Sequence, residues 1–194
     1  ETEPFIAVNT GLGGAEMAAE QVEYVNGSPE TSMGRHRTKN GHQDPWGVKF
    51  WAVGHEMYGD WQLGHMPLSE YSEKHNQVAD AMRFKDPSIQ LIAVGAVGEW
   101  SRTMLENCSG HMEMISEHLY CQDKEDVVEH SRQIAARITE IAQAHRTYRE
   151  NINTLANKDI RVALDEWNYW YGAYEYGELG TRYFLQDGLG AAIG

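Results

Sequence analysis

Five short segments of the chain are rich in apolar and β-branched residues, and each predicts a β-strand. Four of the five are nearly continuous apolar runs, which is typical of parallel strands that are buried on both faces. The exception is Met112–Leu119, which also carries charges. The predicted strands are Phe5–Val8, Val48–Val53, Ile89–Val94, Met112–Leu119 and Ile160–Leu164.

Amphipathic helical patterns lie between these segments. One apolar face ends at Asn26-Gly27, a second ends at Asp86-Pro87, and the clearest lies inside a long polar segment further on. The final stretch, Tyr183–Ile193, predicts a last helix, whereas Gly27–Trp46 is rich in Gly, Pro, Ser and Asn and predicts a long loop. The three apolar faces consist of Ala18, Val22 and Val25; of Tyr71, Val78 and Met82; and of Ile134, Ile138, Ile141 and Tyr148.

The alternation of strands and helices predicts the α/β class, with a parallel sheet and right-handed crossovers. Five strand–helix units use up all 194 residues, whereas a closed eight-stranded barrel needs about 250. The pattern therefore leaves two architectures open, an open five-stranded sheet or part of a barrel.

Composition and charge exclude several classes of partner. The chain is 41% hydrophobic and 23% charged, which is enough apolar material for a real core, and its net charge is −13. Such an acidic chain repels phosphate backbones and anionic lipid, so we expect neither a nucleic-acid nor a membrane partner. The longest apolar stretch, Leu91–Val97, is too short to span a bilayer, and Glu1 is not followed by a signal-peptide pattern. Two cysteines do not make a disulfide scaffold and are compatible with a reducing compartment.

Two carboxylates follow predicted strands. Glu56 comes after the second strand and Glu166 after the fifth, and the carboxyl ends of parallel strands are where ligands gather. A pair of carboxylic acids is what cleavage of a glycosidic bond requires, one as the proton donor and the other as nucleophile or base. The alternative is that both are solvated loop carboxylates. Aromatic residues suited to stacking on sugar rings surround the two acids, namely Trp51, Tyr58, Trp61, Trp167, Tyr169, Trp170 and Tyr171.

Two other motifs resemble binding sites but have simpler explanations. The run Gly11–Gly14 resembles a phosphate loop, yet Glu16 stands where its third glycine belongs, so we predict a tight turn. The pairs Cys108/His111 and His118/Cys121 have zinc-like spacing. However, the strand between them would hold the pairs roughly 20 Å apart, which argues against both a metal site and a disulfide.

The fourth predicted strand carries further candidates near its carboxyl end. His118 and Tyr120 would face the same rim as the two acids, and a structural role for the histidine remains open beside a functional one. Ser116, Glu117 and His118 do not suggest a serine hydrolase, because neighbours in a strand point to opposite faces.

Taken together, these residues resemble glycoside hydrolase family 51, the α-L-arabinofuranosidases. The most specific parts are G-x-E-M-x-G-x-W-Q-x-G-H from Gly54 to His65 and D-E-W-N-x-W-Y from Asp165 to Tyr171. The resemblance follows the chain in order over nearly its whole length. The segments that carry it are Phe5–Asn9, Val25–Gly27, Lys49–His65, Asp86–Ile89, Ile115–Tyr120 and Asp165–Tyr171.

The resemblance implies a (β/α)8 TIM barrel, of which this chain carries roughly units three to seven. Residues 1–194 would form a single partial catalytic domain without the family's C-terminal β-sandwich. It also implies a retaining double displacement with Glu56 as general acid/base and Glu166 as nucleophile, the latter oriented by a hydrogen bond from Tyr120. The other implied pocket residues are Asn9, Trp61, Gln62, His118, Trp167 and Asn168.

One departure from the family stands next to the implied acid. The family has Asn immediately before the acid/base, where its side chain binds a sugar hydroxyl, and this chain has His55. An imidazole is larger than an amide and can become charged, so we expect an effect on substrate choice or on activity itself.

The implied function is release of terminal α-L-arabinofuranosyl groups from hemicellulose-derived chains, without cofactor or metal. We expect an arabinose-containing oligosaccharide or polysaccharide as substrate, a homo-oligomer, and a cytoplasmic or alternatively secreted enzyme. Two other functions stay open: a relative acting on another glycoside such as a β-glucan or β-xyloside, and a non-catalytic carbohydrate-binding relative or truncated fragment.

Overall fold

The computed structural model describes residues 2–171 and 185–194 and divides the chain into two compact units. The first unit runs to Ser116 and also includes Ile152–Ala163. The second comprises Glu117–Asn151 and the described residues from Leu164 onward. Two strands begin in the first unit and end in the second, and each unit is described separately below.

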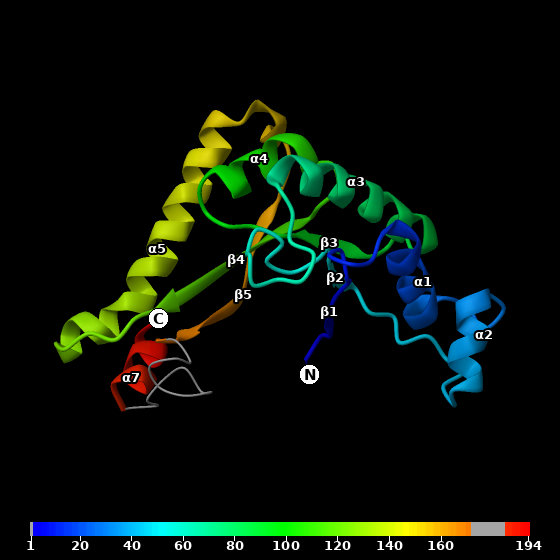
Figure 1. The fold of residues 1–194 in the computed structure, drawn as a ribbon, viewed down its shortest axis with the longest axis horizontal. Coiled ribbons are helices and arrows are strands. Elements are labelled where there is room, and N and C mark those ends of the chain that lie inside the picture. Colours follow the sequence, from blue (N-terminus) through cyan, green and yellow to red (C-terminus); the bar gives the residue numbers. More distant parts are fainter. Residues whose placement is uncertain (1, 172–184) are drawn as a thin grey trace. The chain divides into compact units, whose positions relative to one another are not determined.

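Five strands form one sheet in the order β1-β2-β3-β4-β5 (Figure 1). Strands β1 to β4 pair in parallel, each with the next in sequence. The backbone contacts Arg161 N to Glu113 O and Trp170 N to Cys121 O give β5 the same direction as β4. The predicted parallel α/β sheet is therefore confirmed. The strands are β1 Phe5–Ala7, β2 Phe50–Ala52, β3 Gln90–Ala93, β4 Met114–Cys121 and β5 Arg161–Tyr169.

The predicted helices are present, and two further helical segments and a 3-10 turn accompany them. The apolar faces predicted around Val22, Val78 and Ile134 lie on α1, α3 and α5, and all three residues are buried. The last helix begins at Leu185, and the first two residues of its predicted range lie outside the described residues. The bounds are α1 Ala15–Asn26, α2 Ser32–Lys39, α3 Leu68–Lys85, α4 Glu99–Cys108, α5 Val127–Asn151, η1 Asn153–Leu155 and α7 Leu185–Ile193.

The core of the first unit lies between β1–β3 and the pair α1 and α3, which pack side by side (Figure 1). Trp51 of β2 is fully buried opposite Leu91 of β3, and its indole N–H donates to Val48 O at 2.9 Å. Val22 of α1 and Met82 of α3 close over this cluster with no exposed surface. Burying such side chains contributes about 1.5–3 kcal/mol each to folding.

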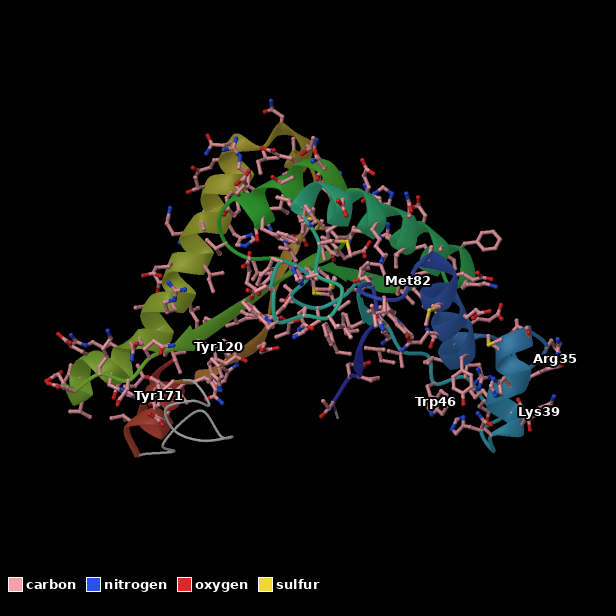
Figure 2. The ribbon with its side chains drawn as sticks, viewed as in Figure 1. Arg35, Lys39, Trp46, Met82, Tyr120 and Tyr171 are labelled. Carbon is pink, nitrogen blue, oxygen red and sulfur yellow. The ribbon has the colours of Figure 1, made fainter. Side chains whose placement is uncertain are left out.

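The predicted long loop Gly27–Trp46 contains the helix α2, so that prediction was wrong in part. The Thr31 side chain caps the helix by accepting from Gly34 N at 3.1 Å. Arg37 is fully buried and donates to four backbone carbonyls, two of them at the end of α1. Its guanidinium also lies 5.9 Å from the ring of Trp46, which Figure 2 labels near α2. This long-range anchoring of α2 has no local sequence signal.

Helix α4 was not predicted, although its apolar residues have helical spacing. Met104, Leu105 and Cys108 are buried on one face, and Trp100 lies on the same side one turn earlier. Gly98 precedes the helix with φ +125°, a conformation that L side chains rarely adopt. The glycines and short length of this segment hid the pattern.

The strands β1 and β5 are less buried than their apolar sequences predicted. Each stands at one end of the strand order, so within the described residues each has a neighbouring strand on one side only. Phe5 is 44% exposed and Val162 37% exposed, whereas Leu91 in the middle of the sheet is fully buried. Burial on both faces therefore holds for the central strands and not for the ends of the order.

In the second unit α5 packs against α7 around the end of β5. Tyr169 is buried, its ring stacks on His130 with centroids 4.4 Å apart, and its hydroxyl donates to the His130 carbonyl at 2.7 Å. His130 Nε2 lies 2.7 Å from a carboxylate oxygen of Asp187 on α7, and that oxygen also accepts from the hydroxyl of Tyr171, labelled in Figure 2. Gly190 leaves room for Tyr169, since a Cβ there would lie 1.8 Å from its hydroxyl.

A second buried polar pair links β4 to α5. Glu117 is 1% exposed and its Oε1 lies 2.7 Å from Nε2 of His145. Its neighbour His118 contacts Asp165 instead. The two adjacent side chains therefore have different partners, as expected for neighbours that point to opposite faces of a strand.

No helix among the described residues is long and apolar enough to cross a membrane. Both cysteines are free, and burial raises the pKa of the Cys108 thiol to about 12 and also raises that of Cys121. Protonated buried thiols are poor metal ligands. The expectation that the two cysteines do not form a disulfide is confirmed.

We predict that Asn26→Asp strongly destabilises the chain. Asn26 Oδ1 accepts from Val48 N, and its Nδ2 donates to both Val48 O and Asp86 Oδ2, each at 2.8 Å. In the variant, a carboxylate oxygen would replace Nδ2 and would face the carbonyl oxygen of Val48 and the carboxylate of Asp86. Both of the hydrogen bonds that Nδ2 donates would be lost. We expect a loss of about 2–4 kcal/mol in unfolding free energy at pH 7, measured by urea denaturation. Asn157→Asp, at an exposed residue, is the matched control. Equal stabilities of the two variants would contradict this role.

We also predict that His75 makes stability fall as the pH falls from about 6.5 to about 4. Burial lowers the pKa of His75 from 6.5 to about 4, so in this window the unfolded chain binds a proton that the folded chain does not. The contribution amounts to up to about 3 kcal/mol. His75→Gln keeps a donor for His111 O, which His75 Nε2 faces at 3.2 Å, but cannot titrate. The midpoint of urea denaturation of His75→Gln should therefore depend less on pH than that of the unsubstituted chain. Equal pH dependence of the two midpoints would contradict this role of His75.

Candidate active site

The first group of candidate residues surrounds Glu56, in the loop that follows β2. Glu56 is only 9% exposed, and both of its carboxylate oxygens accept hydrogen bonds from aromatic side chains. Trp61 Nε1 donates to Oε2 at 2.6 Å and the Tyr58 hydroxyl donates to Oε1 at 3.3 Å. The carboxyl group is therefore held in a defined orientation by residues two and five positions further along the same loop.

The glycines of the G-x-E-M-x-G motif are required by the geometry of this loop. Gly54 has φ +93°, and a Cβ there would lie 2.2 Å from the hydroxyl oxygen of Thr10. A Cβ at Gly59 would lie 2.3 Å from the indole ring of Trp61. The missing side chains therefore let Thr10 pack against Gly54 and the Trp61 ring pack against Gly59. Glu56, which lies between the two glycines, has φ +45°. The spacing of the motif reflects how the loop aims Trp61 at the carboxylate.

A cavity of about 320 Å³, here called the Asn9 cavity, brings together three of the predicted pocket residues. Asn9 comes from the end of β1, and His55 and Gln62 come from the loop after β2. Asn9 Oδ1 accepts from Leu12 N at 3.0 Å and from Gly13 N at 3.3 Å, which closes the predicted tight glycine turn before α1. That prediction is confirmed. Because the turn uses Oδ1 of Asn9, the side-chain NH2 group (Nδ2) is the part suited to contact a ligand.

The second group of candidates belongs to the second unit, where β4 and β5 end. The Tyr120 hydroxyl donates a hydrogen bond to Oε1 of Glu166. His118 Nδ1 lies 3.9 Å from Oε2 of Glu166, and His118 Nε2 lies 3.2 Å from Oδ1 of Asp165. The two ring nitrogens of His118 therefore face different carboxylates, and the side chains of His118, Asp165 and Glu166 interact with one another. They form a polar network that fixes the direction of the Glu166 side chain.

The sequence placed Asp165–Asn168 after the fifth strand, and this placement was wrong. Strand β5 continues to Tyr169, so these residues lie within it, and His118 and Tyr120 likewise lie within β4, which ends at Cys121. Backbone pairing extends the strands further than their apolar residues do. The residues remain near the carboxyl ends of both strands.

The other predicted pocket residues have mixed surroundings. Trp61 is 67% exposed and Trp167 44% exposed, so both offer ring surface to a ligand. Asn168 Oδ1 instead accepts from the backbone N–H of Tyr169 at 2.8 Å, which indicates a local structural contact.

Two residues belong to the contacts around the candidate acids although sequence reasoning gave them no role: Tyr58 donates to Glu56, and Asp165 contacts His118, which in turn lies near Glu166. Tyr58 was counted only among the aromatic neighbours of Glu56, and Asp165 only as part of a motif. The signal for Tyr58 was its position two residues after Glu56. Asp165 had no comparable signal, because its partner His118 is distant in sequence.

Comparison with known families gives a match over residues 13–153 to the alpha-L-arabinofuranosidase 1 domain. The intracellular exo-alpha-(1->5)-L-arabinofuranosidase of Bifidobacterium longum is 33% identical over 187 residues, covering 88% of this chain and 33% of that protein. The protein of the same name from Streptomyces lividans is 32% identical over 180 residues, covering 88% of this chain and 27% of that protein.

Among solved structures, the alpha-L-arabinofuranosidase of Thermotoga maritima, crystallised as an arabinose complex, superposes with a TM-score of 0.89. The sequences are 34% identical, and the match covers 97% of this chain and 39% of that one. The fold is thus an α/β fold with parallel strands, similar to that structure. The chain spans between about a quarter and two fifths of the length of these three relatives.

The family match covers more than half of the chain, and the relatives agree with it along most of the remainder. The chain belongs to the alpha-L-arabinofuranosidase 1 domain family, the assignment that the motifs around Glu56 and Glu166 indicated.

Proposed function

We propose that this chain is part of a retaining glycoside hydrolase that releases terminal α-L-arabinofuranosyl groups from hemicellulose-derived oligosaccharides. The main support is that hydrogen-bond donors hold both motif carboxylates, Glu56 and Glu166, near the carboxyl ends of parallel strands. The chain that carries them belongs to this family. The names of the relatives from Bifidobacterium longum and Streptomyces lividans support the sugar specificity. An arabinose-containing glycan is therefore the proposed substrate.

In the proposed mechanism Glu166 is the nucleophile and Glu56 the general acid/base. A carboxylate oxygen of Glu166 attacks the anomeric carbon while the bond to the leaving oxygen breaks and Glu56 donates its proton to that oxygen. Water then attacks the glycosyl–enzyme, Glu56 takes up a proton from it, and the Glu166 carboxylate leaves. The hydrogen bond from Tyr120 engages Oε1 of Glu166, which supports Oε2 as the attacking atom.

We assign the chain to roughly units three to seven of a (β/α)8 barrel, with residues 1–194 as one partial catalytic domain and none of them in a β-sandwich. Glu56 would then follow barrel strand four, and Glu166 would lie on strand seven. The parallel strand order and the similarity to the Thermotoga maritima enzyme support this numbering. A homo-oligomer is proposed as the state of the enzyme. The word intracellular in the names of two relatives supports a cytoplasmic location.

The first test is hydrolysis of 4-nitrophenyl α-L-arabinofuranoside by the purified chain and by Glu166→Ala. We expect the variant to lose turnover by at least about 10³-fold, because the nucleophile is removed, while binding of arabinose is largely retained. Circular dichroism on the same samples checks folding, and Glu150→Ala, at an exposed glutamate of the same unit, is the control. Full turnover by Glu166→Ala would exclude it as nucleophile. A folded, unsubstituted chain that does not hydrolyse this substrate would favour the two alternatives, a relative acting on another glycoside or a non-catalytic relative.

We further predict that His55→Asn changes the preference among aryl glycosides. His55 is exposed and lines the Asn9 cavity beside Gln62, where an amide is smaller than an imidazole and offers both a donor and an acceptor. The measurement is kcat/KM for 4-nitrophenyl α-L-arabinofuranoside relative to the β-D-xyloside and β-D-glucoside. We expect the ratios to shift by about tenfold, the value of one hydrogen bond. Identical ratios in both proteins would remove His55 from substrate selection.

A further inference from the structure

A second cavity lies on the other side of the Glu56 loop and is here called the Trp100 cleft. It has a volume of about 540 Å³ and lies between the loop after β2 and the start of α4. Since α4 follows β3, both walls come after the carboxyl ends of neighbouring parallel strands. The lining residues are Tyr58, His65, Met66, Pro67, Leu68, Glu99 and Trp100.

The aromatic wall of this cleft is rigidly held. Tyr58 and Trp100 meet edge to face with ring centroids 5.5 Å apart. Trp100 stacks on Tyr71, also at 5.5 Å, and its indole N–H donates to Val94 O at 3.0 Å. Tyr71 is fully buried and its hydroxyl donates to Val53 O. A preorganised, half-buried pair of rings is suited to the C–H face of a sugar, since little side-chain freedom is lost on binding.

Two polar side chains complete the cleft. Glu99 is exposed in the first turn of α4 and supplies carboxylate oxygens. His65 Nδ1 lies 3.1 Å from the carbonyl oxygen of Gln62, so it carries the proton in the neutral ring and leaves Nε2 as an acceptor. Hydroxyl groups are the donors that match a carboxylate and an imidazole nitrogen. Aromatic rings beside two hydrogen-bond acceptors make a surface for a neutral, polyhydroxylated ligand.

The cleft is connected to the proposed acid through Tyr58. The same hydroxyl that belongs to the aromatic wall donates to Oε1 of Glu56 at 3.3 Å. A general acid protonates the leaving oxygen, and the sugar attached to that oxygen must therefore lie beside the acid. The Asn9 cavity, on the β1 side of the same loop, offers the amides and the imidazole suited to the terminal sugar.

We propose that the Trp100 cleft binds the first sugar unit of the leaving group, with Glu99 and His65 accepting hydrogen bonds from its hydroxyls and Trp100 contacting its apolar face. This assignment rests on the proposed function and adds to it the residues that select the leaving group. It predicts that these residues matter for an oligosaccharide and much less for an aryl glycoside, whose leaving group has no hydroxyl groups in the same place.

The test is kcat/KM of Glu99→Ala and His65→Ala on α-1,5-linked arabinotriose and on 4-nitrophenyl α-L-arabinofuranoside. Glu99→Ala removes a hydrogen bond to a charged group and should lower kcat/KM for arabinotriose by about 10- to 100-fold, whereas His65→Ala removes a bond to a neutral nitrogen and should lower it by about tenfold. For both variants the loss should be several-fold larger for arabinotriose than for the aryl glycoside, and for Glu99→Ala at least about tenfold larger. The matched control is Glu106→Ala, at an exposed residue of the same helix outside the cleft. Equal losses on both substrates, or no loss on either, would overturn the proposal.

A binding measurement separates failure of the cleft from failure of the proposed function. Titration of arabinotriose into Glu166→Ala, followed by tryptophan fluorescence, is repeated with Glu99→Ala added to the same variant. We expect about tenfold weaker binding in the double variant. If the unsubstituted chain shows no hydrolysis while this difference persists, the enzymatic proposal and the leaving-group role fail, and the cleft remains only as a sugar-binding surface. If hydrolysis occurs and binding is the same in both variants, the cleft assignment is wrong.

Discussion

The in-register parallel pairing of β1, β2 and β3 is the constraint on which the first unit depends. Because Phe5, Phe50 and Gln90 occupy matching positions, the segments that follow the three strands emerge at one edge of the sheet. The Glu56 loop stands in the middle of this edge, and each neighbouring strand contributes the far wall of one cavity. The central position of β2 in this part of the sheet therefore places one cavity on each side of the loop that carries Glu56.

The sequence was most informative where apolar periodicity and burial coincide. The stripes through Val22, Val78 and Ile134 specified three helices, and the apolar runs specified all five strands. The same reasoning ended the fifth strand too early at Leu164, because backbone pairing and not side-chain polarity decides where a strand stops. Helix α2 was missed since its anchor, the buried Arg37, binds carbonyls that are distant in sequence.

The sequence identified most residues of the candidate site, but it did not identify most of the contacts between them. The motifs pointed to Glu56 and Glu166, while the groups that orient them were only partly recognised. Tyr120 was expected beside Glu166 from the family resemblance, and the structure has that hydrogen bond. The pairing of His118 with Asp165 joins two strands separated by a long helix, and a single sequence contains no signal for such a register.

Helix α5 shows how polar residues can occupy an apolar stripe. His130, Ile134, Ile141 and His145 are all buried on it, at helical spacing, and both histidines face a carboxylate. Burying a charged or polar group is tolerable only with such a partner. The second unit therefore combines apolar packing with directional contacts, which fix the rotation of α5 about its axis in a way that isoleucines alone would not.

The positive φ of Glu56 bears on how replacements at this position are to be interpreted. Asparagine and glycine adopt φ near +45° readily, whereas a β-branched residue such as valine does so only at a considerable backbone cost. Activities of different variants at position 56 thus combine two losses, that of the carboxyl group and that of the loop conformation. Among neutral residues, asparagine separates the two best, because it removes the acid while remaining compatible with the turn.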